Sequence, residues 1–174
     1  MTINSCYDNL EMKSELTTRD CEVIGLILST KGRYGLSMMF ELAKKYGHGT
    51  ISLKDIAKNQ ELSETYLEQL ISHLKKAGLV NSIRGAQGGY ELSRAPADIT
   101  VGQIIRTLEG PLAPSDCVVD SGPECSKAEY CVTRPIWEKI TQSINSVIDS
   151  ITLQNMIEDY NKLNISREGE SNNE

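Results

Sequence analysis

Three of the five cysteines in this chain of 174 residues fall within fifteen positions. Cys117, Cys125 and Cys131 are separated by seven and then five residues, in a stretch otherwise made largely of Asp, Ser, Gly, Pro and Glu. This composition is typical of a loop, because it buries too little apolar surface to hold a fixed shape unaided. Three thiols gathered in such a loop indicate an external organiser, which is either a metal centre or a disulfide.

The composition limits where these thiols act. Hydrophobic residues make up 39% of the chain and aromatic residues 5%, which is typical of a soluble, helix-rich protein. No apolar run approaches the roughly 20 residues of a membrane span, and the first thirty residues lack a secretory signal. The sequence therefore predicts a cytoplasmic protein without a membrane partner. Because cytoplasmic thiols stay reduced, metal binding or sensing is favoured over a structural disulfide.

The charge is distributed unevenly along the chain. The net charge is −6. Residues 29–92 carry nine basic and six acidic side chains, whereas residues 1–28 carry two and five and residues 93–174 carry seven and thirteen. A basic segment within an acidic chain is the expected footprint of a local contact with DNA.

The basic segment has the pattern of a helix-turn-helix. A first helix can start at Ser29 or Thr30, and a short second helix can start at Ser52. After a turn, Ser63 begins an amphipathic third helix that ends at Gly78. A short helix, a tight turn and an amphipathic helix in this order would place the last of them in the major groove of DNA.

Two β-rich runs follow at residues 79–84 and 90–93, and a glycine-rich tip joins them, which predicts a hairpin wing. At its base, Arg84 can reach a phosphate or a narrow minor groove. On the third helix, Glu68 can accept from a cytosine amino group and Gln69 can bond an adenine edge. The predicted DNA-binding residues are Ser63, Thr65, Tyr66, Glu68, Gln69, Arg84, Gly85, Gly88 and Gly89.

After the cysteines, an apolar stripe predicts a long helix that packs on a second copy of the chain. Its members recur with coiled-coil-like spacing: they are Ile136, Ile140, Ile144, Val147 and Ile151. Because a single long helix in so small a protein needs an apolar partner, we expect a homodimer. The predicted fold is mainly α, with a winged helix-turn-helix head and a long C-terminal dimerisation helix.

The sequence thus divides into five parts. Residues 1–27 are predicted to be a flexible extension, or to follow a misassigned start. Residues 28–110 form the winged helix-turn-helix domain and residues 111–133 the cysteine loop. Residues 134–160 form the dimerisation helix region, and residues 161–174 are predicted to be disordered.

The motifs LSTKGRYGL, SLKDIA, LSETYLEQLISHLKKAGLV, SIRGAQGGYEL, ITVGQIIRTLEG and CVTRPIW occur in this order. Together they resemble the Rrf2 family of bacterial winged-helix repressors, over residues 28 to about 155. Within that family, the cysteine triplet is similar to the iron–sulphur branch. The cysteine-metabolism branch is similar through the head but lacks the triplet.

The resemblance implies that Cys117, Cys125 and Cys131 ligate an iron–sulphur cluster of the 2Fe-2S type. It also implies that Glu68 and Gln69 read bases, with Arg84 as the wing contact. Thiolates are recognised ligands of such clusters. Structural zinc favours cysteine pairs about two to four residues apart, and the sequence holds no such pair.

The sequence leaves several candidates for the fourth ligand of the cluster. Arg134 stands where the family's cluster-assembly regulators have a histidine, and a guanidinium cannot ligate iron. A residue of the partner chain is one alternative. The candidates within this chain are Glu129, Asp116, Asp120, Cys6 and Cys21.

The expected function is therefore a homodimeric repressor that binds duplex operator DNA according to its cluster state and controls cluster assembly, iron or sulphur genes. Alternatives are a nitric-oxide or redox sensor, and a cysteine-metabolism repressor acting by thiol state or through a cysteine-biosynthesis or cluster-assembly partner protein. Zinc, a thiol switch and a pure interaction module also stay open. An enzyme is disfavoured, because neither His48 nor His73 completes a nucleophile triad with Cys131.

Overall fold

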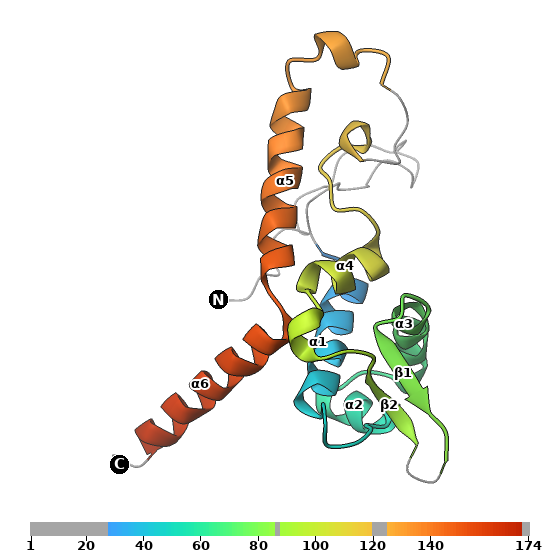
Figure 1. The fold of residues 1–174 in the computed structure, drawn as a ribbon, viewed down its shortest axis with the longest axis vertical. Helices are drawn as coiled ribbons and strands as arrows, with labels where there is room; N and C mark the ends of the chain where they lie inside the picture. Colours follow the sequence, from blue (N-terminus) through green and yellow to red (C-terminus); the bar gives the residue numbers. More distant parts are fainter. Residues whose placement is uncertain (1–27, 86–87, 120–124, 172–174) are drawn as a thin grey trace, which may run out of the picture.

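The computed structural model describes residues 28–85, 88–119 and 125–171. Most of them are helical, and two strands form an antiparallel hairpin. The longer elements are α1 (Thr30–Lys44), α2 (Leu53–Gln60), α3 (Glu64–Lys76), β1 (Val80–Ile83), β2 (Gly89–Leu92), α4 (Val101–Glu109), α5 (Arg134–Ser150) and α6 (Leu153–Ser171). Three short 3-10 turns are η1 (Pro96–Asp98), η2 (Asp116–Val118) and η3 (Ala128–Tyr130). Figure 1 shows α1 to α4 and the hairpin forming a head, from which α5 and α6 project in different directions.

Serine side chains start each of the first three helices, as the sequence predicts. The hydroxyl oxygens of Ser29, Ser52 and Ser63 accept from backbone N–H groups in the first turns of α1, α2 and α3. These bonds satisfy donors that have no partner within the helix. The helices then bury one apolar face each in a shared core, whose least exposed members are Met38, Met39, Leu42, Ile56, Leu67, Leu74, Val80, Ile99, Ile104 and Leu153.

The hairpin closes onto the head through a third extended segment. Val80 pairs with Leu92 at one end of the ladder and Ile83 with Gly89 at the other. The amide nitrogen of Ile51 donates to the carbonyl of Tyr90 at 3.0 Å, and the Tyr90 amide returns the bond at 2.9 Å. Two backbone hydrogen bonds therefore hold the wing against the segment that leads into α2.

The predicted dimerisation helix is two helices in the structure. The chain turns at Ile151, whose carbonyl accepts from the Val101 amide at 2.8 Å, and the Leu153 amide donates to the Ile99 carbonyl at 3.0 Å. This short pairing with the head interrupts the helical ladder. It redirects the chain, so that α6 packs on α1 and the ring of Tyr160 meets Phe40 at 5.5 Å between centroids.

The C-terminal segment also differs from the prediction. Residues 161–171 continue α6 as a helix where we expected disorder. The physical reason is that α6 is already nucleated against the head by the buried Leu153, and extending an existing helix is far easier than starting one. The predicted extension at residues 1–27 lies outside the described residues. No helix among those described is long and apolar enough to cross a membrane.

Candidate DNA-reading head and cysteine loop

The outward face of α3 is polar, as predicted for a reading helix. Leu67, Leu70, Ile71 and Leu74 are buried against the head, whereas Thr65, Glu68, Gln69, Ser72 and His73 are exposed. The turn before it is tight, because Glu61 adopts a left-handed conformation at φ 54° and the Leu62 amide donates to the Ala57 carbonyl at 3.0 Å. Helices α2 and α3 are thus fixed to each other, and Glu68 and Gln69 are exposed on the outer face of α3.

Tyr66 lies differently from the other predicted DNA contacts on α3. It is half-buried, and its hydroxyl donates to Thr30 Oγ1 at 3.3 Å on the first turn of α1. Its ring makes an edge contact with Tyr34, with 6.1 Å between centroids. Tyr66 therefore supports the position of α3 against α1, on the apolar side of the helix that its spacing with Leu70 and Leu74 predicts.

The wing glycines meet steric or backbone requirements of the fold. A Cβ on Gly88 would lie 2.6 Å from the carbonyl oxygen of Ile83, and one on Gly89 would lie 2.7 Å from that of Ile51. Gly85 has φ +126°, which disfavours a side chain there. Arg84 is exposed beside them, and Lys75 Nζ donates to Ser82 Oγ at 2.7 Å, which links α3 to the wing.

Gly89→Ala is expected to lower the free energy of unfolding by about 1–3 kcal/mol, because the clash is with backbone that cannot rotate away. Urea unfolding measures this. Asn81→Ala on the exposed side of β1 is the control and should change it by less than about 0.5 kcal/mol. Equal stabilities for the two variants would contradict the packing described.

The head contains a buried carboxylate that the sequence does not predict. Glu41 is 6% exposed and forms an ion pair with Lys44 at 2.7 Å. It also accepts from Asn59 Nδ2 at 3.4 Å and Gln60 Nε2 at 3.3 Å, which ties α1 to the end of α2. The helical pattern alone gives no signal for the burial of this carboxylate, because Asn59 and Gln60 come from another helix.

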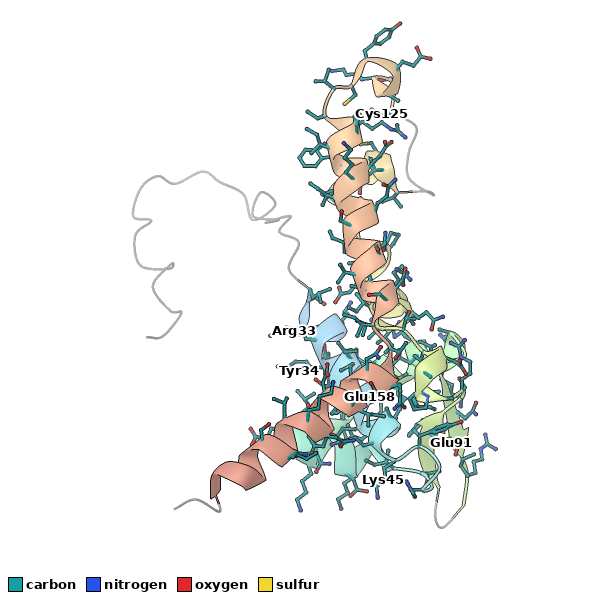
Figure 2. The ribbon with its side chains drawn as sticks, turned by 60° about the vertical axis from the view of Figure 1, so that its left-hand side comes forward. Arg33, Tyr34, Lys45, Glu91, Cys125 and Glu158 are labelled. Carbon is teal, nitrogen blue, oxygen red and sulfur yellow. The ribbon has the colours of Figure 1, made fainter. Side chains whose placement is uncertain are left out.

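The cysteine loop lies at the far end of α5. Figure 2 shows Cys125 remote from Arg33 and Tyr34 on α1. Cys117, Cys125 and Cys131 are half-buried and none forms a disulfide. Ser115 Oγ lies 3.2 Å from the Cys117 thiol, and Thr133 Oγ1 lies 3.3 Å from the Cys131 thiol.

A cavity of about 1300 Å³ separates this loop from α5. Its lining includes Cys117, Cys125 and Glu129, together with the guanidinium-bearing Arg106 and Arg134. Cys131 is not part of that lining. On its α5 side, the buried Oγ1 of Thr141 has no hydrogen-bond partner among the described residues.

The donor types fit an iron–sulphur cluster, since three free thiols share one loop. Within the described ranges, however, no three Cys, His, Asp or Glu side chains are gathered around one point. Asp116 is exposed. Three other predicted candidates for the fourth ligand, Asp120, Cys6 and Cys21, lie outside those ranges.

Arg134 lines the cavity together with Cys117 and Cys125. Its pKa is raised above the ordinary value, chiefly by its hydrogen bond to Glu138 at 2.8 Å, with further contributions from Glu138, Cys117 and Cys125 as negative charges. The guanidinium of Arg134 is therefore a permanent positive charge in the lining of the cavity.

The thiol of Cys131 has a pKa below its ordinary value. The largest cause is the hydrogen bond from the Thr133 side chain, followed by the backbone amides of Thr133 and Arg134. Thr133→Val should raise that pKa. Alkylation of Cys131 by iodoacetamide in cluster-free protein should then begin at a higher pH, because the thiolate is the nucleophile. Mass spectrometry across a pH series measures it, with Thr141→Val as control. An unchanged profile would contradict the contact.

The apolar stripe predicted for dimerisation is unburied in the single chain. Ile136, Ile140, Val147 and Ile151 are 52%, 37%, 58% and 37% exposed. The opposite side of α5 faces the head and the cavity, through Glu138, Gln142 and Asn145. Ile144, the remaining member of the stripe, is half-buried. Most of the predicted stripe is therefore exposed in the single chain.

A helix-turn-helix followed by a two-stranded wing, with a polar face on the second helix, defines a winged helix-turn-helix DNA-binding protein. The model of the Rrf2 family, described as an iron-dependent transcriptional regulator, matches residues 28–159. The chain belongs to the Rrf2 family. Regulators of this family bind DNA and are typically dimeric.

Both branches of the family are among the similar proteins. CymR of Bacillus subtilis is 51% identical over 129 residues, which cover 74% of this chain and 88% of that protein. Its structure has a TM-score of 0.63 and covers 76% of this chain and 96% of that one. The structure of T. potens IscR is 53% identical with a TM-score of 0.64, and covers 79% and 90%. Relatives with both names, CymR and IscR, are described as HTH-type transcriptional regulators and not as enzymes.

Proposed function

We propose that this protein is a homodimeric, cytoplasmic repressor whose affinity for operator DNA is set by an iron–sulphur cluster held by Cys117, Cys125 and Cys131. The observation that carries the proposal is the placement of three free, half-buried thiols in one loop, joined directly to α4 on the DNA-binding head. When bound, the cluster would supply a group that is sensitive to oxidants and to iron supply. The genes controlled would serve cluster assembly or iron and sulphur supply.

The head would read DNA through α3 and the wing. Glu68 and Gln69 are exposed on the face of α3 that is free of core contacts, and Arg84 is exposed beside the wing tip. Ser63 and Thr65 at the start of α3 are also exposed. Phosphate contacts would fix the register, while the two side chains on α3 would select the bases.

A second copy of the chain would cover the apolar stripe of α5. Val147→Asp should raise the dimer dissociation constant at least tenfold, because it buries an unpaired carboxylate twice in a symmetric interface. Sedimentation velocity measures this. Ser146→Asp adds the same charge on an exposed position beside the stripe and should leave the dimer intact. Equal dissociation constants for the two variants would exclude α5 as the dimer interface.

A second candidate is a repressor of cysteine metabolism that responds through thiol state or a partner enzyme. The 51% identity to CymR, described in its structure as a global cysteine regulator, favours it. A nitric-oxide or redox sensor using the same cluster is a variant of the first proposal. The three free cysteines of the loop favour the cluster, because a repressor that responds through a partner enzyme has no need of them.

An absorption spectrum of protein purified without oxygen separates these candidates. The cluster proposal predicts charge-transfer bands between about 300 and 500 nm, with iron and sulphide in equal amounts. A colourless protein that stays free of iron after attempted reconstitution, yet binds DNA, would overturn it. The cysteine-responsive repressor would then be the working function.

A further inference from the structure

Helix α4 lies between the part of the molecule that holds the cysteines and the part that reads DNA. It packs on α1 along one side and on α5 along another (Figure 1). Its last residue, Glu109, is followed at once by Gly110 and the segment that leads to Cys117. A displacement of the cysteine loop therefore reaches α4 directly along the chain, and a displacement of α5 reaches α4 through the packing of the two helices.

The contact between α4 and α5 is made by a guanidinium group on α4. Arg106 Nη1 donates to Asn145 Oδ1 at 3.0 Å, and its Nη2 donates to the carboxylate of Asp149. An exposed ion pair contributes little by itself, but two bonds from one planar group fix its orientation. Gly102, one turn earlier, leaves room for the Asp149 carboxylate against the backbone of α4. Helix α4 thus follows the position of α5.

The contact between α4 and α1 is made by a carboxylate group on α4. Glu109 Oε1 accepts from Ser29 Oγ at 2.6 Å and from the Gly32 amide at 2.7 Å. A negative charge at the C-terminus of α4 is unfavourable for that helix, whereas the same charge is favourable at the N-terminus of α1. A Cβ on Gly32 would lie 2.6 Å from Glu109 Oε1, so the contact requires glycine there. The side chain therefore serves the contact between helices.

The same turn of α1 holds the reading helix. Thr30, between Ser29 and Gly32, accepts the hydroxyl of Tyr66 on α3, and Tyr34 on the next turn meets the Tyr66 ring. Two helices are thus attached to one turn: α4 through Glu109 and α3 through Tyr66. Because Tyr66 lies three residues before Gln69, a shift of this turn moves the base-reading side chains.

We propose that Glu109 is a positioning residue that transmits the state of the cysteine loop and α5 through the first turn of α1 to the reading helix. The proposal rests on the proposed function, because it needs two states of the loop. The proposal adds the route by which the two states of the loop alter the position of the reading helix. Removing the Glu109 contact should equalise the operator affinities of the two states.

The test is the ratio of operator dissociation constants between cluster-loaded protein and the same full-length protein after chelator treatment. Allosteric couplings typically give ratios of about 5 to 150. We expect Glu109→Ala to bring the ratio close to one with an unchanged cluster spectrum. Glu109→Gln should keep most of the ratio, because the amide oxygen can still accept from Ser29 and Gly32. Glu158→Ala, which removes an exposed carboxylate on α6, is the control and should match wild type.

A Glu109→Ala protein with the wild-type ratio would overturn the inference, and so would equal weakening of both forms, which marks a purely structural role. If Glu109→Ala fails to fold or to load a cluster, Ser29→Ala takes its place under the same criteria. A ratio of one in the wild type would overturn the proposed function itself. A wild-type ratio above about five that Glu109→Ala retains would overturn only the transmission route.

Discussion

Each of Cys117→Ala, Cys125→Ala and Cys131→Ala is expected to purify with almost no iron or sulphide, whereas Ser126→Ala keeps the wild-type amounts. Loss of one of three thiolates leaves an iron coordinated by too few ligands, and alanine offers no replacement donor. Ser126 is exposed beside Cys125 and has no predicted role in ligation. Iron and sulphide analysis on protein purified without oxygen gives the result directly.

The outcome for each thiol is informative separately. Cys131 is the thiol outside the cavity lining, so full iron content in Cys131→Ala alone would exclude it and point to a site on the cavity side. Full iron content in all three variants would exclude the cysteine loop as the site of the cluster. Cys6→Ala and Cys21→Ala extend the same assay to the remaining cysteines, since loss of iron in either would identify the fourth ligand.

Operator affinity is expected to fall about 5- to 150-fold in Gln69→Ala, since one bidentate base contact contributes about 1–3 kcal/mol of discrimination. The loss should be confined to operators that carry the matched base pair. Arg84→Ala should instead weaken binding to all duplexes and reduce the slope of log affinity against log salt by about one, as expected for a lost phosphate contact. Fluorescence anisotropy titrations at several salt concentrations measure both.

A control for these variants lies on the same helix. Ser72→Ala removes an exposed polar group one turn away from Gln69 and should leave the sequence preference unchanged. If Gln69→Ala weakened binding to all duplexes equally, Gln69 would contact the DNA backbone and not a base. If Arg84→Ala left the salt dependence unchanged, the wing would lie away from the DNA.

The sequence predicts most of the head, because its signals are local. Ser52 and Ser63 precede apolar residues at helical spacing, and their side chains cap α2 and α3 in the structure. The wing is predictable for the same reason, since the glycines at its tip are close to the two strands they join. Its strands differ from the predicted runs by only one or two residues at their ends.

Features that depend on distant contacts could not be predicted. The break between α5 and α6 exists because Ile151 and Leu153 form backbone bonds to Val101 and Ile99, which lie about fifty residues away in the chain. The hydrogen bond of Tyr66 to Thr30 and the contact of Glu109 with α1 depend on helix packing in the same way. The spacing of the cysteines predicts ligands, but it does not show how their thiols approach one another.

The central claim is that the cluster sets operator affinity. Its most direct test is one titration of the same operator duplex, selected from genomic fragments, with cluster-loaded and with chelator-treated protein at one salt concentration. We predict dissociation constants that differ at least about fivefold. Equal constants, measured on loaded protein with iron and sulphide in equal amounts, would contradict the claim.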